Sequence, residues 1–518
     1  MTSTDTRSRT GVIRPTGYRP DIEGMRSVAI GLVLLYHAGL PFLPGGFVGV
    51  DVFFVISGFL ITGLLIRELE KNGRVSLSRF YARRAKRLLP ATAVVLVTTA
   101  FLTWLTTPVV EWRTFGLDIT GAALYVVNWV LAARAVDYQA EDVGVSPVQH
   151  FWSLAVEEQF YIVWPLLLIA VGWWVAKRSG ARLRPVMLVA IMVVIVPSFV
   201  WSLHLTGADP ERAFFVSTTR LWELGIGAFV AIGSLVWTRI PRLVAIVAGW
   251  LGLAAVVVSG LFVTSATDWP GYAALLPTLG TAAVIIAGFA SGPAGPAGLL
   301  ALRPAVWVGG LSYSLYLWHW PLLVSAEAQW GDLGVLRGML VVLFSFVPAY
   351  LCYRFIENPI RFAEPLARSN RLTLSMGANC TAVGVLAGLM LVLSVPSTAA
   401  PTGGSAAGQG ASVLSGQAGS GKEPDEAAAS AGETPAPGSV GSLEGVTGFV
   451  PAAIDATADI PPRPEEEGCQ VDQVSSEPIR CEYGDPDGAI TIAVVGDSKI
   501  VQWQTVLEDI AEEQGWHM

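Results

Sequence analysis

Residues Met25 to Leu43 read MRSVAIGLVLLYHAGLPFL, an apolar stretch that carries a charged residue, Arg26, and a titratable histidine, His37. His37 lies eleven positions after Arg26, and the geometry of an α-helix, about 100° and 1.5 Å per residue, places both on one face roughly 16 Å apart. Such side chains are costly inside a bilayer, so in a membrane span they indicate a functional site. The alternative is structural, with His37 satisfied by a neighbouring helix.

The whole chain has the composition of an all-α polytopic membrane protein. Of its 518 residues, 53% are hydrophobic and 14% are charged. Apolar runs long enough to cross about 30 Å of hydrocarbon recur along it. Twelve segments are predicted, at residues 25–43, 47–66, 89–107, 116–134, 158–176, 185–204, 215–236, 243–264, 273–292, 306–325, 334–356 and 374–396.

Basic residues between these segments predict which ends face the cytoplasm. The loop at 67–87 is the most basic, and three segments separate it from the next basic loop, at 177–184. Two cytoplasmic loops need an even number of crossings between them. Segment 116–134 contains Asp118 and Arg134, so we predict that it is broken or re-entrant and buried in protein. About eleven transmembrane helices then place the N-terminus inside and the C-terminal segment outside.

The predicted organisation has five parts. These are a cytoplasmic tail (1–20), a transmembrane domain (21–364), a further transmembrane helix with its cytoplasmic lead-in (365–396), a Gly/Ala/Ser/Pro linker (397–467) and a C-terminal segment (468–518). The linker composition cannot bury a core and predicts a flexible, disordered tether. The tail lacks the features of a cleavable signal peptide.

The C-terminal segment has an α/β pattern. Ala489 to Val495 (AITIAVV) predicts a buried strand, and a helical pattern follows through Glu513. Cys469 and Cys481 are candidates for a disulfide in an oxidising compartment. Two cysteines without a nearby histidine or second pair lack the ligands for zinc, and no metal site is predicted.

Further polar residues border the apolar segments, and each has two interpretations. His150, Glu157 and Glu158 would orient a sugar hydroxyl or form a solvated interfacial turn. Arg220 and Glu223 are spaced for a helical ion pair, which would be architectural or touch substrate. His319 lies among tryptophans that are typical of a membrane interface, as an anchor or a catalyst.

The run FYARRAKRLLP, residues 80–90, also has two interpretations. Arg83, Arg84 and Arg87 would fix topology and attract lipid head groups. Alternatively, their guanidinium groups would bind the phosphates of a nucleotide-bearing donor, since guanidinium contacts phosphate through two parallel hydrogen bonds. Composition alone favours the first.

Several motifs occur together in order, and their combination is specific. They are YRPDIEGMR (18–26) leading to His37, GVDVFFVISGFLIT (49–62), the basic run just described, HFWSLAVEEQFY (150–161), RLWE (220–223), YLWHWP (316–321) and ENP (357–359). Over residues 18 to 362 the chain resembles the acyltransferase-3 family of membrane acyltransferases. The strand followed by Gly-Asp-Ser resembles the first block of SGNH-type esterase domains.

The resemblance implies transfer of an acyl group, commonly acetyl, from cytoplasmic acyl-CoA to a hydroxyl of a cell-envelope glycan or glycolipid in a bacterial plasma membrane. Acyl-CoA would be a donor substrate, with no permanently bound cofactor and no nucleic acid partner. His37 would be a general base or a transient acyl carrier. The implied site residues are His37, Arg26 and Glu157 for catalysis, Arg83, Arg84 and Arg87 for the donor, and His150, Glu158, Arg220, Glu223, His319 and Glu357 for the acceptor or for structural support.

The C-terminal segment departs from its resemblance. Ser498 would be the nucleophile, but the later oxyanion blocks and the Asp-x-x-His are missing. Position 514 is Gln, so His517 has no place in a triad. We expect an inactive stub, either truncated or vestigial.

Two other functional classes remain open. A glycolipid or glycan transporter or flippase would also use buried charges and a re-entrant segment, although no internal repeat is evident. A sensor whose spans anchor the external segment is poorly supported, because that segment is incomplete.

Overall fold

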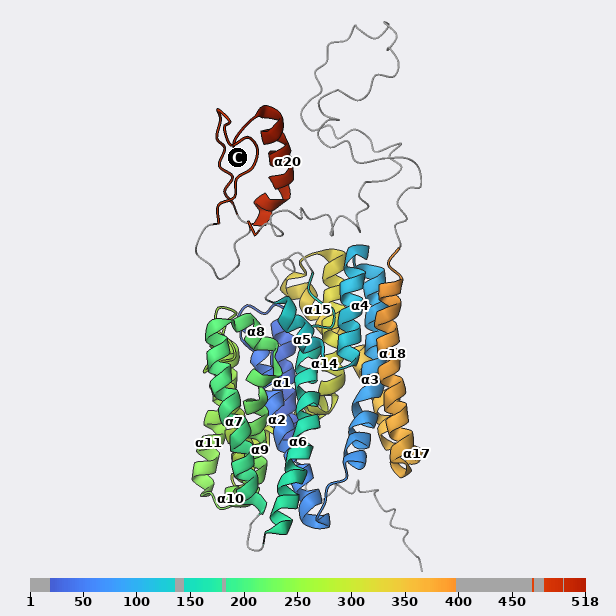
Figure 1. Ribbon diagram of the computed structural model, residues 1–518. Helices are drawn as coiled ribbons and strands as arrows, with labels where there is room; N and C mark the ends of the chain where they lie inside the picture. The colour runs from blue at the N-terminus through green and yellow to red at the C-terminus, as the bar shows by residue number, and fades with distance from the viewer. Residues whose placement is uncertain (1–18, 136–143, 179–182, 397–467, 470–478, 497) are drawn as a thin grey trace, which may run out of the picture. The chain divides into compact units, whose positions relative to one another are not determined.

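The protein is a bundle of helices followed by a small separate unit. The computed structural model describes residues 19–135, 144–178, 183–396, 468–469, 479–496 and 498–518. The helices of the first unit, Met1–Val395, run side by side (Figure 1). They are α1 (Pro20–His37), α2 (Gly49–Asn72), α3 (Leu77–Thr106), α4 (Val109–Ala123), α5 (Val127–Arg134), α6 (Phe151–Lys177), α7 (Leu183–Ala208), α8 (Pro210–Phe215), α9 (Leu221–Ile232), α10 (Ser234–Trp237), α11 (Arg242–Phe262), α12 (Leu275–Ala287), α13 (Pro296–Leu300), α14 (Arg303–Trp330), α15 (Gly334–Cys352), α16 (Asn358–Phe362), α17 (Glu364–Arg368) and α18 (Asn370–Leu393), with short 3₁₀ turns η1 (Gly46–Val48), η3 (Ser217–Thr219) and η4 (Gly292–Ala294) and a π-helix, η5 (Tyr353–Glu357).

The prediction of a multi-pass membrane protein is confirmed. Seven helical stretches in the described residues are long and apolar enough to cross a bilayer. They are Gly46–Asn72, Leu77–Thr106, Phe151–Lys177, Leu183–Ala208, Arg242–Phe262, Gly334–Phe362 and Asn370–Leu393. Helices α9 and α12 are apolar but shorter. The count of eleven crossings therefore stays a prediction.

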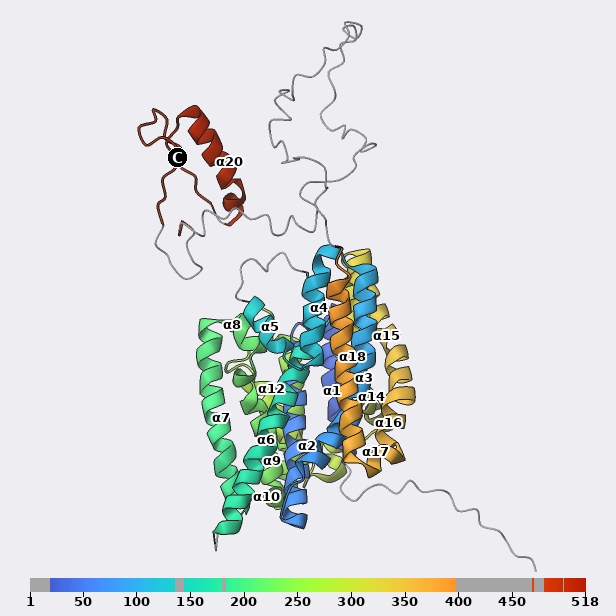
Figure 2. The ribbon, with the colours of Figure 1, turned by 45° about the vertical axis from the view of Figure 1, so that its right-hand side comes forward.

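Helix α1 lies between the α7 side of the bundle and the α3–α18 side, as Figures 1 and 2 show. Its apolar residues Met25, Ala29 and Val33 are fully buried, which explains why this segment is helical and central. The predicted segment 25–43 is displaced, because the helix begins at Pro20 and ends at His37. Gly39 follows with a left-handed φ of 78°, a conformation that terminates helices.

Helix α14 packs against α1 at a glycine. A Cβ atom at position 309 would lie 1.8 Å from the carbonyl oxygen of Glu23. Only glycine therefore permits this approach, which brings His319 on α14 to the end of α1.

Replacing Gly309 should destabilise the bundle. We expect Gly309→Ala to lower the free energy of unfolding by about 1–3 kcal/mol, because the added methyl group forces the two helices apart. Thermal unfolding in detergent measures this. Gly310→Ala is the matched control, since its Cβ would meet nothing within 4 Å. Equal melting temperatures for the two variants would contradict the predicted close contact.

The predicted break in segment 116–134 is confirmed. Helix α4 ends at Ala123 and α5 begins at Val127. The chain folds back on itself, because Arg134 on α5 forms an ion pair of 2.7 Å with the fully buried Asp118 on α4. The acidic and basic residues that made this segment a poor span thus neutralise each other.

The second unit is described by itself. The disulfide between Cys469 and Cys481 is confirmed, with a Cα–Cα distance of 5.9 Å, and the predicted helix is α20 (Ser498–Gln514). The predicted buried strand over residues 489–495 is wrong: an isolated bridge joins Thr491 to His517, and Val495 is 89% exposed. A strand without a covered face and paired neighbours is not stable. The predicted linker, 397–467, and residues 1–18 of the predicted tail lie outside the described residues.

Candidate active site

Two cavities lie inside the helix bundle. The larger cavity has a volume of about 830 Å³ and the smaller cavity about 340 Å³. Val50 on α2 and Tyr316 on α14 line both. Arg26 lines the larger cavity and His37 the smaller one, so these two residues of α1 lie at different cavities that share a wall.

The larger cavity is basic and partly neutralised. Its cationic lining residues are Arg26, Arg67, Arg83, Arg84, Lys86, Arg87 and Arg361. Three of them form ion pairs: Arg26 with Glu23 at 3.0 Å, Arg83 with Glu68 at 3.0 Å and Arg84 with Glu158 at 2.8 Å. Two of the three arginines predicted to bind donor phosphates, Arg83 and Arg84, thus already have carboxylate partners.

The remaining cations are uncompensated. Four cations, Arg67, Lys86, Arg87 and Arg361, form no ion pair with another described residue, and Nε of Arg87 is buried without a hydrogen-bond partner. Arg26 and Arg361 line the same cavity as Arg87 and carry the same charge. An anion that entered this part of the cavity would relieve the repulsion and satisfy the buried N–H group.

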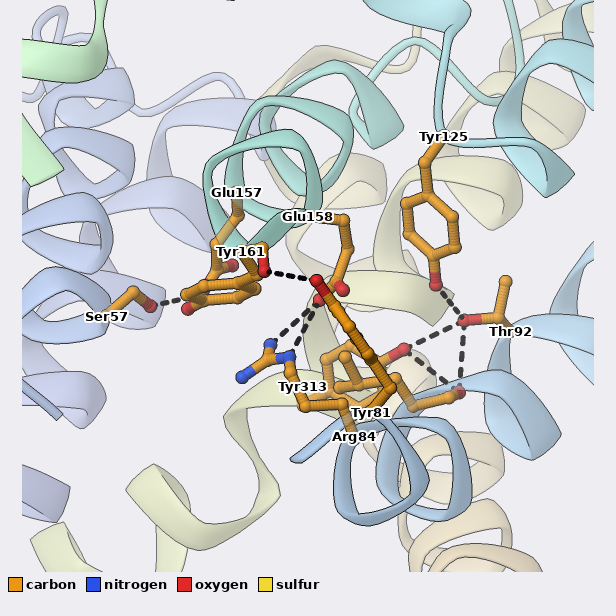
Figure 3. Close-up of polar contacts among 10 residues, drawn as sticks. Ser57, Tyr81, Arg84, Thr92, Tyr125, Glu157, Glu158, Tyr161 and Tyr313 are labelled. Carbon is orange, nitrogen blue, oxygen red and sulfur yellow. Dashed lines mark hydrogen bonds and ion pairs between the residues drawn. The ribbon is translucent and has the colours of Figure 1, made fainter. Parts of the chain in front are cut away.

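Glu157 lies in the larger cavity with hydroxyl donors around it. Ser57 and Tyr161 both donate hydrogen bonds to its Oε1 (Figure 3). Glu157 lines the larger cavity and not the smaller one that contains His37 and His150, so its predicted catalytic role beside His37 stays a prediction. Seven residues of helix separate Glu157 from His150 by about 10 Å.

The turn between α4 and α5 brings a strained tyrosine to the larger cavity. Tyr125 has a positive φ of 56°, which is costly for a residue other than glycine and recurs at functional sites. Its hydroxyl lies 3.3 Å from that of Thr92, which lies 2.8 Å from that of Tyr313 (Figure 3). The broken segment therefore supplies a wall of the cavity.

The smaller cavity is aromatic and contains two histidines. His37 Nδ1 lies 3.0 Å from Nε2 of His319, which is fully buried. His150 is 4% exposed, and neither of its ring nitrogens has a partner among the described residues. The cavity is lined by Val33, Tyr36, His37, Phe47, Val50, Gln149, His150, Trp152, Phe214, Thr264, Ser265, Thr267, Trp269, Tyr316 and Trp320. None of these residues carries a permanent charge.

The predicted ion pair of Arg220 and Glu223 is confirmed, and a third residue joins it. Arg220 Nη1 lies 3.0 Å from both Glu223 and Asp51, all three being buried. The guanidinium group lies over the rings of Trp152 and Phe214, at 5.3 and 5.2 Å. This buried cluster therefore supports two walls of the smaller cavity and lines neither cavity itself.

Two further predicted site residues lie in different parts of the chain. Glu357, in the π-helix η5, lines the larger cavity and accepts a hydrogen bond of 3.2 Å from Ser314. Ser498 begins α20 in the second unit, and its side chain lies outside the described parts.

Sequence reasoning missed several residues of both cavities. Asp51 and Ser57 occur in the quoted motif GVDVFFVISGFLIT, where a carboxylate in an apolar run was a visible signal. Tyr316 occurs in the quoted motif YLWHWP, as a polar side chain beside an apolar run. Arg361 and Tyr125 gave no signal, because their approach depends on the fold.

Comparison with known proteins identifies the family. Peptidoglycan O-acetyltransferase OatA of Listeria monocytogenes is 32% identical over 357 residues, covering 66% of this chain and 56% of the relative. O-acetyltransferase OatA of Staphylococcus aureus is 32% identical over 358 residues, covering 66% and 57%. The chain thus spans less than two thirds of the length of these relatives, and no solved structure was found to match it. The family model described as an acyltransferase domain, acyltransferase-3, matches residues 19–354; the chain belongs to this family.

Proposed function

We propose that the protein is a membrane O-acyltransferase that moves an acyl group, most simply acetyl, from acyl-CoA to a hydroxyl of a cell-envelope glycan. The main support for this proposal is the pair of cavities. One is lined by cations, the other by aromatic rings without permanent charges, and both share the wall of Val50 and Tyr316. A transferase needs a place for each substrate and a point where they meet. The name of the Listeria monocytogenes relative makes peptidoglycan the first acceptor to test.

The larger cavity suits the donor. Coenzyme A carries phosphates, and the uncompensated Lys86, Arg87 and Arg361 offer cations to bind them. The excess of positive charge also favours a cytoplasmic opening for this cavity, which is where acyl-CoA is found. Arg83 and Arg84 then shape the cavity through their carboxylate partners, and Arg87 is the member of the predicted set with capacity to bind phosphate.

The smaller cavity suits the acceptor. Its aromatic rings would pack against the apolar faces of a sugar, and Gln149 and the threonines offer hydrogen bonds to hydroxyl groups. His150, with two unsatisfied ring nitrogens, would orient the reacting hydroxyl. His37 would take the proton of that hydroxyl.

The reaction follows from these positions. The acceptor oxygen forms a bond to the thioester carbonyl carbon as its proton passes to His37. The carbon–sulfur bond then breaks, and the CoA sulfur leaves with the electron pair and receives a proton. The products are an O-acyl glycan and free CoA.

Reconstitution tests the proposal. Proteoliposomes containing the protein would receive radiolabelled acetyl-CoA on one side and soluble peptidoglycan fragments on the other. We expect label on the fragments and release of CoA that depends on their presence. Movement of fragments across the bilayer without labelling would instead favour a transporter.

A further inference from the structure

The pair of His37 and His319 determines which nitrogen of His37 is reactive. Two distances define the arrangement: His319 Nδ1 lies 3.1 Å from the carbonyl oxygen of Leu315, and His319 Nε2 lies 3.0 Å from His37 Nδ1. The rings are nearly parallel, at an interplanar angle of 20°. No role for His319 follows from either cavity alone, because it lines neither.

The carbonyl of Leu315 fixes the proton of His319. A carbonyl oxygen accepts hydrogen bonds and cannot donate, so Nδ1 of His319 carries a proton and donates it. A charged ring would be buried beside His37 and His150 with no carboxylate in contact among the described residues, which is costly. His319 is therefore neutral, and its Nε2 is an acceptor.

Because Nε2 of His319 is an acceptor, it determines which ring nitrogen of His37 carries the proton. Nδ1 of His37 must donate to Nε2 of His319, and a neutral imidazole carries one proton. Nε2 of His37 is then unprotonated, and the contact through Nδ1 with His319 is the one hydrogen bond that the ring of His37 forms with the described residues. We infer that His319 is a positioning residue, which holds His37 in the tautomer whose Nε2 is the reactive nitrogen.

This inference rests on the proposed function and adds the orienting group that the site otherwise lacks. In other enzymes a carboxylate usually orients a catalytic histidine, whereas here a neutral imidazole does so through its backbone contact. Both open roles of His37, base and acyl carrier, require the same free nitrogen. The inference therefore holds for either role.

Matched variants of His319 test the inference. We expect His319→Leu to lower kcat by about 10- to 100-fold with an unchanged KM for acetyl-CoA. His319→Gln should recover most of this loss, because its amide oxygen can accept the proton of His37 Nδ1. His204→Leu is the control, since this histidine is exposed on α7. Wild-type kcat in His319→Leu, or equal losses in the Leu and Gln variants, would overturn the inference.

A methylated histidine gives a second test that does not depend on how well the Leu variant folds. Nδ1-methylhistidine at position 37, in a His319→Ala background that makes room for the methyl group, leaves Nε2 as the only basic nitrogen. We expect this protein to be more active than His319→Ala alone, and absence of rescue would overturn the inference. Full activity of His37→Ala would instead contradict the proposed function itself.

Discussion

His37→Ala should reduce acyl transfer by about 10²- to 10⁴-fold, the usual contribution of a general base. The reason is positional: His37 lines the smaller cavity and is held by His319 at 3.0 Å. Donor affinity should not change, because His37 does not line the larger cavity. The measurements are transfer of labelled acetyl to peptidoglycan fragments and equilibrium binding of acetyl-CoA to the same preparation.

Two controls separate this result from a general loss of structure. His204→Ala removes an exposed histidine on α7 whose ring contacts Trp201, and it should retain full activity. Incubation of the wild-type protein with labelled acetyl-CoA in the absence of acceptor distinguishes the two roles of His37. A base leaves no label on the protein, whereas an acyl carrier does. Unchanged turnover in His37→Ala would remove His37 from the site.

The sequence predicted those parts of the fold that depend on local pattern. A long apolar segment in lipid has no water to bond its backbone groups, so it forms a helix, and most predicted spans coincide with helices. The parity of the basic loops placed the break in segment 116–134, where Asp118 and Arg134 now pair. The strand predicted at 489–495 was wrong, because strand stability depends on neighbours that a local pattern does not contain.

The candidate site was predictable only in part for the same reason. Arg26 and His37 stand out because polar groups in an apolar helix are expensive. The contact of His37 with His319 joins residues 282 positions apart, and nothing in the spacing predicts it. Likewise, composition does not distinguish Arg84 from Arg87. In the structure Arg84 is paired with Glu158, whereas Nε of Arg87 is buried without a hydrogen-bond partner.

The second large effect is expected at the shared wall. Val50→Trp should lower acyl transfer by about 10²-fold, the cost of misplacing two reacting groups by about 1 Å. Val50 is 8% exposed and lines both cavities, so an indole there would fill the point where thioester and acceptor hydroxyl meet. Acetyl-CoA should still bind, because the cations of the larger cavity are untouched. Transfer and donor binding are measured as for His37→Ala.

Two companion variants make this test specific. Leu60→Trp adds the same group to the larger cavity at a side chain that is 39% exposed and does not line the smaller cavity; it should transfer normally. Val50→Ala widens the wall, so the rate with propionyl-CoA should rise relative to acetyl-CoA, by up to the roughly 10-fold that one methylene group commonly contributes to selectivity. If Val50→Trp folds and transfers at the wild-type rate, the acyl group does not pass at this wall. An unchanged ratio in Val50→Ala would show that the wall does not select acyl length.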